Sequence, residues 1–300
     1  MILTVCLNPA VDKTCTIDKL CPGEVNRLSN AVSVAGGKGV NVAKVLRKFS
    51  MKVVMVGFLG GMGGRLIEEA LERLSVENYC TSIKGETRTN VNILGEDGCV
   101  TEILEPGPVI TGKELLEFRK QFLGCLDMCR MVVLSGSMPA GVPGDFYAQL
   151  IRECHMAGCK VFLDASGEAL RHGIGAGPDL IKPNKKELEF LAGRKLESLE
   201  DIKSEARKLL VQGVGKVIVS LGSDGLLYAD KEQELFWEAR KVKAVNTVGC
   251  GDTVVASICM SELDGDEPEL ALQKAVAMAA ANAMNRENGC FSMEEYLDLL

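Results

Sequence analysis

The chain has 300 residues, 47% of them hydrophobic and 25% charged, which is ordinary for a globular protein that buries a large core. Its net charge of −7 argues against general binding to nucleic acid or to anionic membranes, although a few local cations would suffice to bind a small anion. No apolar run reaches the length of a membrane span, and the N-terminal MILTVCLNP is typical of a first strand and lacks the basic start of a signal peptide. We therefore expect a cytoplasmic protein.

Continuous apolar runs alternate with segments of helical periodicity along the chain. The predicted strands are 1–7, 52–59, 131–136, 160–166, 180–184 and 216–222. The predicted helices are 64–74, 113–126, 145–158 and 200–213, followed by 252–263 and 268–285. Continuously apolar strands indicate a sheet covered on both faces, and their alternation with helices indicates parallel pairing. The pattern therefore predicts an α/β fold.

Two stretches, 13–34 and 87–104, do not follow this alternation. Both look like short strands joined by turns, and EDG at 96–98 is a hairpin signal. We expect them to form one small sheet that stands off the main domain. Because no linker, low-complexity tract or internal repeat divides the chain, residues 1–300 are predicted to form a single domain that carries this small sheet.

The twelve cysteines do not form a metal-binding pattern. There is no C-x-x-C pair, and only His155 and His172 could supplement the thiolates. Cys125 and Cys129 are spaced to share a helix face, but two thiolates do not complete a tetrahedral zinc site. Most of the cysteines lie in apolar runs, so we expect buried, reduced side chains.

Polar residues collect where several predicted strands end. They are Asn8 and Asp12; Ser135, Gly136 and Ser137; Asp164 and Ser166; Lys182, Pro183 and Asn184; and Ser220 and Gly222. Open α/β sheets bind their ligands outside the carboxyl ends of the strands. The sequence therefore predicts a binding site on this rim.

Two glycine clusters accompany the polar rim. AGGKGVNVAKVL (35–46) opens a helix and suits an anion or a hydroxylated ligand, but its spacing matches neither a Walker P-loop nor a dinucleotide fingerprint. NTVGCGDT (246–253) opens a second apolar helix. Taken alone, this segment is either a tight turn with Asp252 as helix N-cap or part of a site, and the pattern leaves both readings open.

Nine segments, in order along the whole chain, carry a resemblance to a known family. They are LNPAVD (7–12), AGGKGVNVAKVL (35–46), GETRTNVNIL (85–94), TEILEPGP (101–108), SGSMPAGVP (135–143), LDASGEAL (163–170), IKPNKKEL (181–188), VSLGSDG (219–225) and NTVGCGDT (246–253). Together they resemble the ribokinase-type (PfkB) carbohydrate kinases, and most closely the branch of 1-phosphofructokinase and tagatose-6-phosphate kinase. The resemblance implies a ribokinase-like α/β/α domain with a mostly parallel central sheet. The two stretches 13–34 and 87–104 would form its lid, which often pairs with a second subunit, so a homodimer through the lid is implied.

The resemblance also implies roles in phosphoryl transfer from ATP. Asp252 would be the base that takes the proton of the sugar hydroxyl. The backbone N–H groups of Gly249, Cys250, Gly251 and Asp252 would form an anion hole at a helix N-terminus. Lys182, Asn184, Ser220 and Gly222 would bind the nucleotide. Glu187 would act on Mg²⁺ through water, because this ion keeps several of its waters.

Substrate recognition is implied in the same way. Asp12, Gly37 and Asn41 would hold sugar hydroxyls. Lys38 and Arg88 are the predicted clamp for a phosphate on the sugar, with Arg27 and Ser137 as weaker additions. Cys250 lies at a helix N-terminus, where a thiol tends to a lowered pKa, so we expect its alkylation to block ATP binding and to be slowed by ATP.

The first candidate reaction is phosphorylation of fructose 1-phosphate to fructose 1,6-bisphosphate. The alternative is tagatose 6-phosphate giving tagatose 1,6-bisphosphate, towards which TEILEPGP and the C-terminal NGCFSMEEYLDL lean, and fructose 6-phosphate is less favoured. From another class, the chain could be a non-catalytic sugar-phosphate sensor on a kinase fold. The presence of Asp252, Asn184 and Glu187 argues against the sensor.

Overall fold

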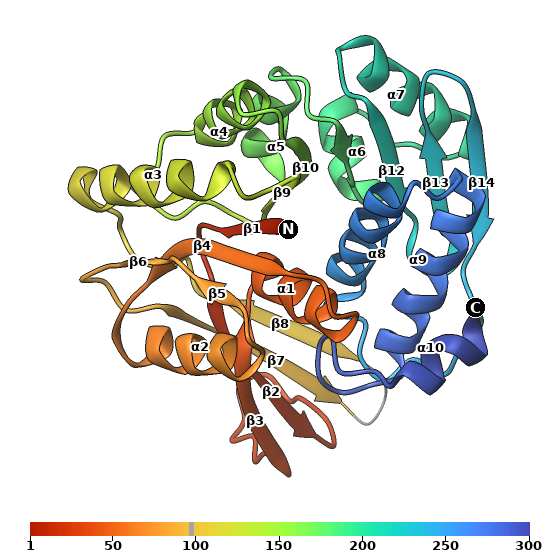
Figure 1. Cartoon of the computed structure of the whole chain (residues 1–300). Coiled ribbons are helices and arrows are strands. Elements are labelled where there is room, and N and C mark those ends of the chain that lie inside the picture. The colour runs from red at the N-terminus through yellow and green to blue at the C-terminus, as the bar shows by residue number, and fades with distance from the viewer. Residues whose placement is uncertain (96–98) are drawn as a thin grey trace.

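The computed structural model describes residues 1–95 and 99–300 of the chain (Figure 1). Its strands are β1 (Ile2–Cys6), β2 (Ala10–Ile17), β3 (Asn30–Gly36), β4 (Val53–Leu59), β5 (Glu77–Asn78), β6 (Thr81–Ser82), β7 (Arg88–Gly95), β8 (Val100–Leu104), β9 (Met131–Ser135), β10 (Lys160–Asp164), β11 (Leu180–Ile181), β12 (Lys216–Ser220), β13 (Gly225–Ala229) and β14 (Glu234–Glu238). Its helices are α1 (Lys38–Lys48), α2 (Gly61–Arg73), α3 (Gly112–Leu126), α4 (Phe146–Met156), α5 (Gly167–Ile174), α6 (Lys185–Ala192), α7 (Leu199–Val211), the short 3₁₀ helix η1 (Gly222–Asp224), α8 (Cys250–Asp264), α9 (Pro268–Ala283) and α10 (Met293–Leu299).

The main sheet has the order β14-β13-β12-β11-β10-β9-β1-β4-β5, with β6 paired to β4. All pairs from β12 to β5 are parallel, as the alternation of strands and helices predicts. β13 and β14 add an antiparallel edge, which the sequence analysis did not predict. Parallel strands that begin at one edge of a sheet also end at one edge, so the polar residues after β1, β9, β10, β11 and β12 come to a common rim.

Helices cover both faces of the main sheet. Leu3 and Val5 of β1 join one apolar cluster, which contains residues from α3 to α7. Ile2 and Cys6 point to the opposite face and join a second cluster, with residues from α1, α2, α8, α9 and α10. This alternation is the two-residue period of a strand, and it explains why successive residues of the strands are apolar rather than alternating with polar ones. The arrangement is the expected three-layer α/β/α architecture.

A second sheet has the order β3-β2-β7-β8 and projects from the main sheet at the bottom of Figure 1. It is built from the two stretches that broke the alternation of strands and helices, 13–34 and 87–104, so this prediction is confirmed. The hairpin expected at 96–98 lies outside the described residues. β2 follows directly on β1 and β3 leads directly into α1, which places the base of the small sheet at the rim of the main sheet. Within the described residues, no helix is both long and apolar enough to cross a membrane.

Candidate active site

The rim brings together a buried group of hydrogen-bonding side chains at the base of the small sheet. Asp12 is 5% exposed, and Asn90 Nδ2 donates to its Oδ1 at 3.0 Å. A Cβ atom on Gly36 would lie 2.0 Å from Asp12 Oδ2, so only glycine leaves room for this carboxylate. Burial raises the pKa of Asp12 above its ordinary value, and the hydrogen bond from Asn90 opposes the rise.

Two amide oxygens of this group have no partner in the described part of the chain. They are Asn41 Oδ1 and Asn90 Oδ1, and both residues are buried. A buried acceptor without a donor costs free energy unless a ligand or water supplies one, so the two atoms mark a place for hydroxyl groups. Asn41 and Asp12 were predicted there. Asn90 was not, and its only signal was its alternation with Asn92 along a strand of the small sheet.

Asp252 lies beside this group, on the first turn of α8. It is buried, with 6% of its surface exposed, and Asn41 Nδ2 donates to Asp252 Oδ2 at 2.8 Å. The N-cap of α8 is Gly249, with a left-handed φ of 81°, so the interpretation of Asp252 as a helix cap is wrong. A left-handed backbone favours glycine. Because Gly249 occupies the N-cap position, the Asp252 side chain does not cap the helix.

The surroundings of Asp252 favour the protonated, uncharged form of its carboxyl. Its pKa is raised to about 7, mainly by burial and with a smaller contribution from the charge of Asp164. Lys38, the hydrogen bond from Asn41 and Lys182 act in the opposite direction. A carboxyl with such a pKa exchanges protons readily at neutral pH, which is a property of general bases.

The N-terminus of α8 supplies N–H groups next to Asp252. The first residues of a helix have no intrahelical acceptor, so the Gly251 and Asp252 N–H groups are available to an anion. Cys250 N donates to Thr247 O at 3.4 Å and is therefore already partly engaged. A Cβ atom on Gly251 would lie 3.2 Å from Lys182 Nζ, which places a buried ammonium directly beside these groups.

Three charged side chains join the ends of α1, β10 and β11. Asp164 is buried and lies between Lys38 Nζ at 3.2 Å and Lys182 Nζ at 3.3 Å. The two cations lower the pKa of Asp164 against the effect of its burial. Lys182, predicted to bind nucleotide, is 4% exposed and lies beneath the helix N-terminus rather than in the cavity described below.

The predicted phosphate clamp is not assembled as a pair in this structure. Lys38 is bound to Asp164, whereas Arg88 donates to Asn8 O at 3.0 Å and to Glu105 O at 2.9 Å. Ser137 shares Asn8 with Arg88 as a hydrogen-bond partner, because Asn8 Nδ2 donates to Ser137 Oγ at 3.2 Å. Arg27 is exposed in the connection between β2 and β3. Gly37, with φ 94°, caps α1, and a Cβ atom there would lie 3.0 Å from Pro9 Cα.

On the other side of Asp252 lies a cavity of about 530 Å³. Its polar lining includes five predicted residues, Asn184, Ser220, Gly222, Cys250 and Gly251. Its apolar walls come from β13, α8, α9 and the segment before α8, with Leu226, Val242, Val254, Val276, Ala279, Ala280 and Ala283. A mostly apolar cavity with polar groups at one end suits a flat ring whose charged substituent points at the helix N-terminus.

Asn184 and Glu187 form a capping box at the start of α6. Asn184 Oδ1 accepts from Glu187 N at 2.9 Å, and Glu187 Oε2 accepts from Asn184 N at 2.8 Å. The N-x-x-E spacing therefore has a local structural function, and of its two residues Asn184 also lines the cavity. Within residues 1–95 and 99–300 there is no group of three or more His, Cys, Asp or Glu side chains able to hold a metal alone. A Mg²⁺ ion that arrives with a triphosphate would have phosphate oxygens and water as its main ligands, with Glu187 at their edge.

The expectation of a lowered pKa for Cys250 is wrong. Its side chain turns into the packing between α8 and α9, where Sγ lies 3.4 Å from Ala279 O and accepts from Asn282 Nδ2 at 3.4 Å. Burial raises the pKa of the Cys250 thiol, and the hydrogen bond from Asn282 only partly offsets this. The effect of desolvation thus outweighs that of the helix N-terminus.

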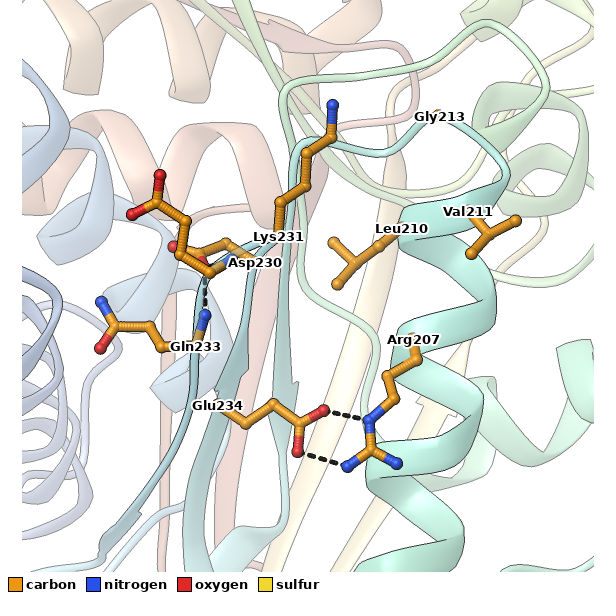
Figure 2. A pocket seen from close by; sticks show the side chains of 9 residues that line it. Arg207, Leu210, Val211, Gly213, Asp230, Lys231, Gln233 and Glu234 are labelled. Carbon is orange, nitrogen blue, oxygen red and sulfur yellow. Dashed lines mark hydrogen bonds and ion pairs between the residues drawn. The ribbon is translucent and has the colours of Figure 1, made fainter.

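A second hollow, of about 780 Å³, lies between the end of α7 and the turn from β13 to β14 (Figure 2). Its Arg207 is already paired with Glu234, with Nη2 2.7 Å from Oε2. Val217 pairs with Ala229 and Ser220 with Leu226, so this turn lies at the amino end of β12, opposite the rim. The hollow contains none of the predicted site residues and is not the candidate site.

Comparison with known proteins agrees with this geometry. The family model described as "pfkB family carbohydrate kinase" matches residues 5–293. A tagatose-6-phosphate kinase of Staphylococcus epidermidis is 37% identical over 99% of this chain and 96% of its own. The phosphofructokinase-2 of Escherichia coli, solved with substrates and products, superposes with a TM-score of 0.92 at 28% identity, over 99% and 97% of the two chains. A possible 1-phosphofructokinase of Thermotoga maritima gives 0.90 at 28% identity, over 100% and 97%. The chain belongs to the pfkB family of carbohydrate kinases and is a sugar-phosphate kinase with a ribokinase-like fold.

Proposed function

We propose that the protein transfers the γ-phosphoryl group of ATP to the free terminal hydroxyl of a ketohexose monophosphate. The observation that carries this proposal is the position of Asp252. It lies between the hydroxyl-binding group of Asp12, Asn41 and Asn90 and the cavity lined by Cys250 and Gly251. A proton acceptor at that junction touches the sugar on one side and the transferring group on the other.

In the proposed reaction, Asp252 accepts the proton of the sugar hydroxyl as its oxygen bonds to the γ-phosphorus. The bond from the γ-phosphorus to the bridging oxygen breaks, and ADP leaves with the electron pair. The N–H groups at the start of α8 and the buried Lys182 ammonium stabilise the negative charge on the transferring group. Mg²⁺, when bound with the nucleotide, would neutralise phosphate charge, and Glu187 would be the residue to hold its water shell.

Recognition of the phosphate on the sugar falls mainly to Arg88 and Ser137. Both contact Asn8, so both lie at the base of the small sheet near the hydroxyl-binding group. An arginine presents several donors in one plane, which suits phosphate oxygens. Lys38 instead faces Asp164, and its pKa is raised by the charges of Asp164, Asp252 and Glu187 against the effect of burial. We assign it to the transferring phosphoryl group rather than to the phosphate of the sugar.

Two phosphorylated ketoses fit this scheme. Fructose 1-phosphate is the first candidate from the sequence, and the product would be fructose 1,6-bisphosphate. Tagatose 6-phosphate has independent support from the 37% identical relative that carries that name. Each substrate has a phosphate at one end of a ketose and a free hydroxyl at the other, so one arrangement of Arg88 and Asp252 can serve both.

A substrate panel tests the proposal. Fructose 1-phosphate, tagatose 6-phosphate, fructose 6-phosphate and the unphosphorylated sugars are assayed with Mg-ATP. We expect the highest kcat/KM with one of the first two, and a loss of roughly 10²-fold or more for the sugar without phosphate, since the half-buried Arg88 would lose its contact with the phosphate. Turnover confined to unphosphorylated sugars would refute the assignment of Arg88. Tight binding of a sugar phosphate without any turnover would favour the sensor.

The small sheet is also the proposed surface of a homodimer. Val32, Val100, Ile103 and Leu104 are exposed on its strands, and every residue of β8 is exposed. Apolar residues grouped on an exposed sheet are typical of a protein interface. Sedimentation of the wild type and of Ile103→Glu tests this. A dimer that becomes a monomer in the variant supports the proposal, and a wild-type monomer contradicts it.

A further inference from the structure

A basic groove of about 900 Å³ lies behind the candidate active site. It is bounded by α1, α2, the end of β3 and the segment 287–290 between α9 and α10. Four cations line it, Lys44, Arg47, Lys48 and Arg73, together with two carboxylates, Glu69 and Glu287. The groove thus carries a surplus of two positive charges in a protein whose net charge is −7.

The four cations have neutral partners. Arg47 donates to Leu74 O at 2.9 Å and to Met51 O at 2.7 Å, and Arg73 Nε donates to Glu69 O at 3.2 Å. Lys44 Nζ donates to Ala35 O, and Lys48 Nζ lies 5.2 Å from the centre of the Phe291 ring.

In the described part of the chain, none of these four cations forms an ion pair with a carboxylate within 4.0 Å. Other surface arginines differ, since Arg119 pairs with Glu153 and Arg194 with Glu205. Carbonyl oxygens and a ring face orient the groove cations without cancelling their charge. The groove therefore keeps both its positive potential and the donors needed by an anion.

We propose that this groove is a second binding site, separate from the catalytic one, for a small phosphorylated anion that modulates activity. A phosphate monoester carries a charge of about −1.5 to −2 at pH 7 and three acceptor oxygens, which matches the surplus charge and the donors of the groove. The volume of about 900 Å³ admits a phosphorylated metabolite and not only a bare ion.

Two contacts connect the groove to the candidate active site. Lys44 holds the carbonyl of Ala35, the residue before Gly36, and Gly36 packs against Asp12. One turn earlier on the same helix, Asn41 donates to Asp252. An anion that draws the Lys44 ammonium towards itself would loosen the backbone that positions the sugar-binding residues.

The second connection runs through the segment 287–290. Gly289 N donates to Asn282 Oδ1 at 2.7 Å, and Asn282 Nδ2 donates to Val248 O at 3.1 Å. A Cβ atom on Gly249 would lie 3.0 Å from Asn288 Cβ, so this segment also packs against the cap of α8. An occupant of the groove therefore contacts elements that support both the sugar side and the phosphoryl side of the site. We expect it to change the KM for the sugar more than the stability of the fold.

Binding is tested on the full chain saturated with ADP and sugar phosphate, so that the catalytic site is occupied, with inorganic phosphate as the calorimetric titrant. We expect about one phosphate bound per chain, with an affinity that falls as salt is added. The double variant Lys48→Gln/Arg73→Gln, which changes two exposed groove residues, should lose at least about tenfold in affinity. Lys52→Gln, an exposed lysine outside the groove, is the matched control and should bind like the wild type.

Kinetics supply the second readout. Phosphate should change the KM for the sugar at least about twofold in the wild type and in Lys52→Gln, and this response should shrink in the groove variant while its activity without phosphate is unchanged. If phosphate merely competed with the sugar phosphate at the catalytic site, it would change KM equally in all three proteins. Such competition is thereby distinguished from binding in the groove. Equal phosphate binding in the three proteins, or no binding to the saturated wild type, would overturn the proposal. The calorimetric titration can succeed even if the proposed function is wrong, because ADP alone can be used when no sugar phosphate proves to be a substrate.

Discussion

The pH dependence of kcat/KM depends on the environment of Asp252. Burial raises the pKa of this carboxyl to about 7, and Lys38 is the strongest influence in the opposite direction. With that pKa, about a tenth of the carboxyl is ionised at pH 6 and about nine tenths at pH 8, so kcat/KM should rise roughly tenfold over this range. The sign follows from the proposed role, because the base works only when it is deprotonated.

Replacing Lys38 by Met removes the cation that favours ionised Asp252. The midpoint of the rise should move to higher pH by roughly one unit, which corresponds to ~1.4 kcal/mol of lost stabilisation of the carboxylate. Lys38→Arg retains the charge and should keep the midpoint of the wild type. The phosphate of the sugar itself titrates near pH ~6. Since that titration is the same for all three proteins, the differences between their profiles report on the protein.

The assay is a coupled measurement of ADP release at subsaturating sugar phosphate, over the pH range in which all three proteins remain folded. Coincident midpoints for the wild type and Lys38→Met would show that Lys38 does not act on Asp252. A flat profile for the wild type across neutral pH would refute the assignment of a raised pKa to the base.

Three further predictions concern the cavity. Gly251→Ala places a methyl group 3.2 Å from Lys182 Nζ, where the transferring phosphate is proposed to approach, and should lower kcat by about 10- to 100-fold. A kcat within twofold of the wild type in steady-state assays would contradict this close approach. Because burial raises the pKa of the Cys250 thiol, iodoacetamide should modify Cys250 more slowly than the exposed Cys21 at pH ~7, and bound ATP should slow the reaction of Cys250 further. Peptide mapping in which Cys250 reacts first would refute this. Val276, Ala279 and Ala283 give the cavity an apolar wall without side-chain donors or acceptors, whereas Ser223, Arg240 and Lys241 line other parts of it. If the base packs against the apolar wall, GTP should support a kcat/KM within about tenfold of ATP, and a preference near 10⁴ would indicate a base-reading group instead.

The sequence predicts the architecture well because the signals of the main sheet are local. β1, β4, β9, β10 and β12 are mainly apolar and buried, with polar residues mostly at their ends, which follows from burial on both faces. The antiparallel edge was missed because β14, with the sequence ELFWE, is short and only partly buried. The short β5 and β6 add too few residues to give a periodic signal.

The candidate site likewise has some features that the sequence reveals and others that it does not. The glycines at 249 and 251 and the acid at 252 stand out in the sequence, but it is the family resemblance, and not their spacing alone, that assigns them to the site. The partner of Lys38 cannot, because Asp164 lies 126 positions away and competes with any ligand for the same ammonium group. The pKa of Cys250 depends on which way its side chain turns between α8 and α9, and that direction is decided by packing rather than by position at a helix end.

The most direct test of the central claim is Asp252→Asn. The substitution keeps the size of the side chain and removes the proton acceptor. We expect turnover of the sugar phosphate to fall by about 10²- to 10⁴-fold, with dissociation constants for ATP and sugar phosphate within about threefold of the wild type.

Stability supplies the control for Asp252→Asn. The pKa of Asp252 is higher in the folded protein than in the unfolded chain, so this residue costs stability as pH rises from about 4 to about 7. The Asn variant should therefore melt no lower than the wild type at pH ~8, and lost turnover will not reflect unfolding. A folded variant with near wild-type turnover would contradict the role of Asp252 as the base, and a variant that binds neither substrate would contradict its position between them.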